Sequence, residues 1–181
     1  MFGKFKLLRM ACAVALSFCI CSPVVVLAAT TESAVKAGFI YNFSKFIEWP
    51  ASTKLYTKFN ICIVGDSRLE DGLDALEGKM VGNKPISVHK KISKDSLKNC
   101  QILFIAEDGD QETYALLHAT GNAPVVTVSD SPEFILKGGM IGLIRNGSRV
   151  GFEVNLTPAN AADIHFRAQL LKLAKNVRGL K

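Results

Sequence analysis

The sequence has none of the short motifs that mark nucleotide-binding or hydrolytic sites. No GxxxxGK[ST] loop is present, and no GxGxxG follows the first predicted strand, so neither type of phosphate-binding loop is found. No GxSxG, HExxH or CxxC spacing occurs, and the three histidines, His89, His118 and His165, are isolated. We therefore expect no catalytic residue, no metal site and no cofactor, and we interpret the protein as a non-enzyme.

An excess of charge of one sign is also absent. The sequence has 22 lysines and arginines against 16 aspartates and glutamates, and Lys4, Lys6 and Arg9 lie in the first nine residues. The rest of the chain therefore has 19 basic against 16 acidic residues, a formal charge of +3. This balance excludes a nucleic-acid-binding surface, which would need clustered basic residues. The densest basic run is predicted to be a solvated face rather than a lipid or polyanion patch; it comprises Lys84, Lys90, Lys91, Lys94 and Lys98.

The first 29 residues have the pattern of a secretory signal peptide. A positively charged start precedes an apolar stretch from Met10 to Leu27, and small residues at Ala28 and Ala29 are typical of a cleavage site. The alternative is an uncleaved membrane anchor, because 18 apolar positions approach the minimum for a span. The helix-breaking Pro23 weakens that alternative. We predict a signal peptide at 1–29 and a mature periplasmic domain at 30–181.

Few cysteines remain after this segment is removed. Of the five in the sequence, Cys12, Cys19 and Cys21 fall in the signal peptide, which leaves Cys62 and Cys100. Two cysteines in an oxidising compartment favour a disulfide, and the alternative is two separate buried thiols. A bridge between them would contribute about 4 kcal/mol under the chain-entropy account of loop closure.

Short apolar runs alternate with helical patterns through the middle of the chain. The runs at 59–64, 101–106 and 125–128 are typical of strands buried on both faces, and a weaker strand is predicted at 85–89. Helices are predicted at 31–49, 67–77 and 110–119, with a short one after Ser131 and Pro132. This alternation predicts a single three-layer α/β domain with a mixed, mostly parallel sheet flanked by helices.

The end of the chain is predicted to be a hairpin followed by one helix. Strands at 140–145 and 149–155 flank Asn146 and Gly147, a strong signal for a tight turn. Thr157 is the expected cap of a long final helix, and Gly179 lies just beyond its expected end.

Acidic residues follow three of the predicted buried strands. Asp66, Glu107 and Asp130 would meet at the carboxyl edge of the sheet, where ligands bind in open α/β folds. Helix capping is the simpler explanation for such positions. A pocket at this edge is the basis of an alternative function, a periplasmic small-molecule sensor or carrier.

The first predicted helix has more apolar side chains than one face can hold. Seven of the eleven residues from Phe39 to Trp49 are aromatic or aliphatic. Exposed aromatic patches mark partner surfaces, whereas a helix buried on most sides would explain the same composition.

Segments in this order resemble the YfiR-like family of secreted bacterial regulators. The resemblance extends from about Val35 to Val177 and rests on the segments 35–50, 61–66, 100–105, 126–130, 138–142, 152–156 and 169–174. It implies a periplasmic repressor that binds and inhibits the extracytoplasmic domain of an inner-membrane diguanylate cyclase, lowering cyclic-di-GMP and biofilm formation. It also implies a homodimer and release by an outer-membrane lipoprotein. Family members carry disulfides, and Cys62 and Cys100 match one pair, whereas a second pair near 138–142 is missing here.

Under this hypothesis the partner surface combines the two ends of the mature chain with the hairpin. The residues predicted to contact the partner are Phe39, Phe43, Trp49, Arg149, Glu153, Asn155, Arg167, Leu170 and Leu171. For each of them, plain packing or hairpin pairing is the alternative role.

Overall fold

The computed structural model describes residues 31–65, 68–106, 109–147 and 149–180, so the predicted signal peptide lies outside the described residues. Within these ranges, eight strands form one sheet in the order β10-β8-β7-β6-β5-β2-β4-β3. The parallel strands are β4 (Lys84–Lys90), β2 (Phe59–Val64), β5 (Ile102–Ile105), β6 (Val126–Ser129) and β7 (Ile141–Asn146). The antiparallel neighbours are β8 (Arg149–Asn155) and β3 (Met80–Val81), and β10 (Asn176–Arg178) runs parallel to β8 at the edge. The predicted mixed, mostly parallel sheet is confirmed.

Side chains of the central strands alternate between two apolar layers. Ile61 and Ile63 belong to the larger core, whereas Cys62, between them, belongs to a smaller cluster with Leu103 and Ile105. This alternation follows from the period of two in a strand. Because both faces are apolar, both must be covered, which explains the continuous hydrophobic runs in the sequence.

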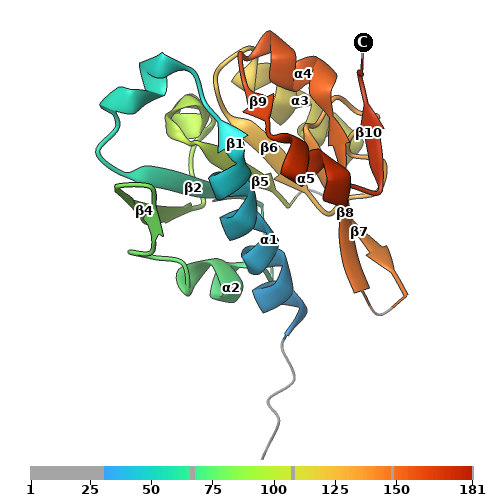
Figure 1. Cartoon of the computed structure of the whole chain (residues 1–181), viewed down its shortest axis with the longest axis horizontal. Coiled ribbons are helices and arrows are strands. Elements are labelled where there is room, and N and C mark those ends of the chain that lie inside the picture. The colour runs from blue at the N-terminus through green and yellow to red at the C-terminus, as the bar shows by residue number, and fades with distance from the viewer. Residues whose placement is uncertain (1–30, 66–67, 107–108, 148, 181) are drawn as a thin grey trace, which may run out of the picture.

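Helices cover the two faces of the sheet (Figure 1). On one face lie α1 (Glu32–Phe46), α2 (Glu70–Asp74), α4 (Leu156–Ala161) and α5 (Ala168–Leu173), whose buried residues join the larger core. On the other lie α3 (Asp110–Thr120) and the 3-10 helix η2 (Lys94–Asn99), which pack on the smaller cluster through Leu116 and Leu97. A second 3-10 helix, η1 (Ala51–Leu55), follows Pro50. The three-layer α/β prediction is confirmed.

The predicted disulfide is present. Cys62 of β2 is bonded to Cys100, which lies just before β5, with the two Cα atoms 5.9 Å apart. Since β2 and β5 are neighbouring parallel strands, the bridge crosses directly between them inside the smaller apolar cluster.

The first helix is mostly buried and shorter than predicted. Ile40 and Phe43 are almost fully buried, and Phe39, Phe46 and Trp49 are partly buried, so packing on most sides explains much of its apolar excess. It ends at Phe46 because Ile47 and Glu48 form the short strand β1, which pairs with β9 (His165–Phe166).

The prediction of a single long C-terminal helix is wrong. Two short helices and two strands occupy residues 156–178 instead. The amide of Ala162 bonds back to Ala159, and Asp163 adopts a positive φ of 55°, which ends α4. β9 then pairs with β1 and β10 pairs with β8, so contacts with distant strands override the local helical pattern.

Two other predicted helices differ in the structure. The 67–77 segment forms only the five-residue α2, and Leu76 and Glu77 follow it in turns made by hydrogen bonds to residues three positions back. The residues after Pro132 form turns, because Glu133 has a positive φ of 57° that interrupts a helix.

Candidate functional site

The end of α1 and the strand β1 meet the segment that leads into α5, the last helix. β1 pairs with β9 so that Ile47 lies opposite Phe166, and the amide of Arg167 donates to the carbonyl of Phe46 over 3.0 Å. The Arg167 side chain also donates to Glu48 over 2.8 Å. The end of α1 and the start of α5 are therefore held together, as a surface made from both ends of the chain requires (Figure 1).

Three of the nine predicted contact residues are buried. Phe43 and Leu170 have exposed fractions of 1% and 3% and belong to the larger core. Asn155 is also buried: its Oδ1 accepts from the amide of Thr157, and its Nδ2 donates to the carbonyl of Ile135. Asn155, rather than the predicted Thr157, is thus the N-cap of α4. These three side chains therefore pack inside the domain rather than on its surface.

Three of the apolar side chains of α1 and α5 that remain accessible are Phe39, Leu171 and Leu173. Phe39 is half-buried, with its ring 5.8 Å from that of Phe152 on β8. Leu171 is half-buried, and Leu173 is 71% exposed. Leu173 is the last residue of α5, so its exposure follows from the end of the helix there.

The hairpin residues have different surroundings. Arg149 is exposed at the tip, opposite Asn146, where β7 and β8 project from the domain (Figure 1). Glu153 lies further along β8 and accepts a hydrogen bond of 3.2 Å from Asn176 of β10. Trp49 faces a separate pocket, away from α5, that is described below.

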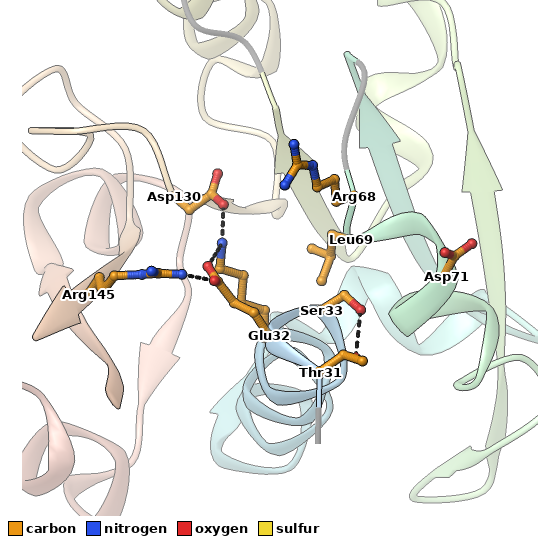
Figure 2. A pocket seen from close by; sticks show the side chains of 9 residues that line it. Thr31, Glu32, Ser33, Arg68, Leu69, Asp71, Asp130 and Arg145 are labelled. Carbon is orange, nitrogen blue, oxygen red and sulfur yellow. Dashed lines mark hydrogen bonds and ion pairs between the residues drawn. The ribbon is translucent and has the colours of Figure 1, made fainter. Parts of the chain in front are cut away.

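A cleft of about 650 Å³ opens at the carboxyl ends of the parallel strands (Figure 2). The start of α1, the segment after β2, Asp130 after β6 and Arg145 of β7 line it. This is the edge where the sequence predicted an acidic pocket, and Asp130 is part of it. Asp66 and Glu107 lie outside the described residues.

A row of ion pairs crosses this cleft. The Lys36 ammonium lies 2.5 Å from Asp130 and 2.8 Å from Glu32, and Arg145 also pairs with Glu32. Since cations and carboxylates alternate, the network is close to neutral and ties the start of α1 to β6 and β7. Arg68 and Asp71 lie on the opposite wall (Figure 2). This arrangement can hold a small polar molecule through ion pairs and hydrogen bonds. Sequence reasoning missed Lys36, Arg68 and Arg145 because they come from separate segments.

Among residues 31–65, 68–106, 109–147 and 149–180, no helix has the length and apolar character needed to cross a membrane. In the same ranges, no three His, Cys, Asp or Glu side chains gather as metal ligands would.

Solved structures of similar fold share very little sequence with this chain. A conserved domain protein from Vibrio cholerae O1 biovar El Tor matches with a TM-score of 0.57 and 9% identity, over 82% of this chain and 60% of that one. The ABC domain from Streptococcus pneumonia, solved in complex with L-Trp, matches with a TM-score of 0.50 and 8% identity, over 80% of this chain and 61% of that one. The chain thus spans about three fifths of each. At these identities the likeness shows the α/β fold alone.

The amino-acid sequence shows which protein family this chain belongs to. Residues 33–175 match the DUF4154 family, described as YfiR/HmsC-like, which is most of the described chain. The protein belongs to this family. Membership supports, at most, a periplasmic regulatory role.

Proposed function

We propose that this protein is a periplasmic repressor that binds the extracytoplasmic domain of an inner-membrane diguanylate cyclase and inhibits it. The result would be less cyclic-di-GMP and less biofilm. The observation that carries the proposal is membership of the YfiR/HmsC-like family over residues 33–175. The predicted signal peptide at 1–29 supports it, because export would place the domain where only the sensing half of a transmembrane cyclase is accessible.

The mechanism needs differential binding and no chemistry. A repressor that binds the inactive conformation of the sensing domain more tightly than the active one shifts the population toward the inactive state. A tenfold difference in affinity corresponds to about 1.4 kcal/mol, which a few well-placed interface side chains can supply.

The proposed contact surface, which we call the α5 surface, consists of Phe39, Arg167, Leu171 and Leu173. Arginine and large apolar side chains carry much of the energy of protein interfaces. Leu173 is 71% exposed, so burying it against a partner would remove apolar area from water. Arg149 and Glu153 of the hairpin are proposed as polar contacts at the rim.

Two further parts of the proposal follow from the resemblance to the YfiR-like family. The repressor would be a homodimer, and an outer-membrane lipoprotein would sequester it to release the cyclase. Sedimentation velocity of the mature protein tests the first part. Competition between the lipoprotein and the cyclase domain for the repressor tests the second.

Binding measurements with purified domains test the main proposal. The periplasmic domains of the inner-membrane cyclases of the source bacterium would be immobilised one at a time and titrated with mature protein. We expect saturable binding to one of them, weakened by Leu173→Glu and unchanged by Lys172→Gln on the same helix. Lack of binding to every such domain would contradict the proposal.

A small-molecule sensor or carrier is the second candidate function, favoured by the cleft at the strand ends. Its volume, about 650 Å³, suits a small ligand, and its lining carries three cations and three carboxylates, which suits a zwitterionic or polar molecule. Native mass spectrometry of protein purified from periplasm tests this candidate. A retained small molecule, lost in the Arg68→Ala and Asp130→Ala variants, would support it.

A further inference from the structure

A second pocket, of about 350 Å³, lies at the opposite end of α1 from the strand-end cleft. The last turn of α1, Trp49, the residue before β2 and the turn between β3 and β4 contribute to its lining. Its volume is in the range of small-ligand sites.

The charged groups of this pocket are all positive. Lys45, Lys58 and Lys84 line it, and no aspartate or glutamate does. These three lysines come from separate segments, so the fold gathers their positive charge at the pocket. Clefts lined by one sign of charge concentrate ions of the opposite sign.

Two of these lysines make specific contacts. Lys84 donates to the carbonyl of Thr53 over 2.9 Å. The ammonium of Lys45 lies 3.9 Å from the centre of the Tyr41 ring, a contact that leaves its charge uncompensated by a carboxylate.

Two other lysines of the basic run, Lys90 and Lys94, have carboxylate partners. Lys90 lies 2.7 Å from Asp74, whose carboxylate raises the pKa of Lys90 by accepting a hydrogen bond, and Lys94 pairs with Glu112 at 2.9 Å. These pairs offset their charge, whereas the pocket itself contains no carboxylate to do so.

A flat aromatic wall completes the pocket. The Trp49 indole N–H donates to the carbonyl of Gln101 over 3.3 Å, and its ring meets that of Phe59 at 5.2 Å and 84°. These contacts fix the orientation of the half-buried indole. An apolar ring beside cationic groups is complementary to a ligand with one aromatic ring and one negative charge.

We propose that this pocket binds a small aromatic carboxylate. The carboxylate would pair with Lys45 and Lys58 at the rim, and the ring would lie against Trp49. The site goes beyond the proposed regulatory function and does not depend on it, since it involves neither the α5 surface nor a cyclase.

Trp49 provides a direct reporter, because it is the single tryptophan in the sequence. Mature protein would be titrated with benzoate at low salt while Trp49 emission is recorded, with benzamide as the neutral control of similar shape. We expect a saturable change with benzoate and at least about fivefold weaker binding of benzamide, since two exposed ion pairs together contribute about 1 kcal/mol. Added salt should weaken benzoate binding more than benzamide binding.

Variants of pocket and control residues test whether benzoate binds in this pocket. The double variant Lys45→Gln/Lys58→Gln should bind benzoate about fivefold more weakly, and Lys172→Gln on α5 should bind as the wild type does. Urea unfolding of each variant checks that it is folded. Equal affinity for benzoate and benzamide, an unchanged affinity in the folded double variant, or no saturable benzoate response in fluorescence and equilibrium dialysis would each overturn the proposal.

Discussion

The side chain of Arg167 donates a hydrogen bond of 2.8 Å to Glu48, across 119 residues of sequence. The pair lies beside the short β1–β9 ladder, where Ile47 is opposite Phe166. The pair joins the segment after α1 to the start of α5, and its arginine belongs to the proposed α5 surface.

Arg167→Ala should weaken partner binding and leave the stability of the fold almost unchanged. Arg167 and Glu48 are 52% and 55% exposed, so losing their ion pair should lower the free energy of unfolding by less than about 1 kcal/mol. If Arg167 contacts the cyclase domain, its loss should weaken binding about tenfold. Urea unfolding and biolayer interferometry measure the two effects. Glu48→Ala breaks the same pair but keeps the arginine, so an equal loss of binding in both variants would argue that Arg167 acts only through the pair.

Asn155→Ala should destabilise the fold and leave partner affinity unchanged. The change removes the cap of α4 and leaves the carbonyl of Ile135 without the donor from Asn155. We expect a loss of about 2 kcal/mol in unfolding free energy, measured by urea. Asn155→Asp keeps the capping oxygen but places a carboxylate oxygen against the carbonyl of Ile135, so it should also be destabilised. A weaker partner affinity in folded Asn155→Ala would instead support the contact role predicted from the sequence.

Two glycine substitutions near α1 should have opposite effects. A Cβ on Gly72 of α2 would lie 2.5 Å from the backbone oxygen of Ser33, so Gly72→Ala should push α2 from α1 and cost about 2 kcal/mol. Gly38 lies within α1, and a Cβ there meets nothing within 4 Å. Gly38→Ala should raise stability by about 0.5 to 1 kcal/mol, because alanine favours a helix. Thermal unfolding of both variants checks the signs, and stabilisation by Gly72→Ala would refute the close approach of the two helices.

The Cys62–Cys100 bridge should stabilise the mature domain substantially. It closes a loop with a sequence separation of 38, so its loss is expected to cost about 4 kcal/mol under the chain-entropy account. Urea unfolding with and without reductant would show this difference in the wild type. The Cys62→Ala/Cys100→Ala variant should show no reductant dependence. Labelling of both thiols in periplasmic protein would contradict the bridge.

The central part of the fold could be predicted because its signals are local. β2 at 59–64 and β5 at 102–105 are buried on both faces, which demands continuous apolar runs. Asn146 and Gly147 specify the hairpin turn, and Gly147 has the positive φ of 60° that such a turn needs.

The C-terminal segment and the pockets could not be predicted because they depend on distant contacts. Residues 165–166 and 176–178 have a helical pattern, but pairing with β1 and β8 makes them strands. Lys45 and Lys58 are isolated in the sequence and Lys84 belongs to the basic run, and only the fold brings the three to one pocket. Among the residues predicted to contact a partner, burial of Phe43, Asn155 and Leu170 became visible only in the packed structure.

Cellular cyclic-di-GMP tests the regulatory role most directly. It would be measured in the source bacterium with the gene intact, deleted, or deleted and complemented by either the full-length protein or a form lacking residues 1–29. We expect deletion to raise cyclic-di-GMP, full-length protein to restore the lower level, and the form without the predicted signal peptide to fail. An unchanged cyclic-di-GMP level after deletion, in every growth state tested, would contradict the proposed function.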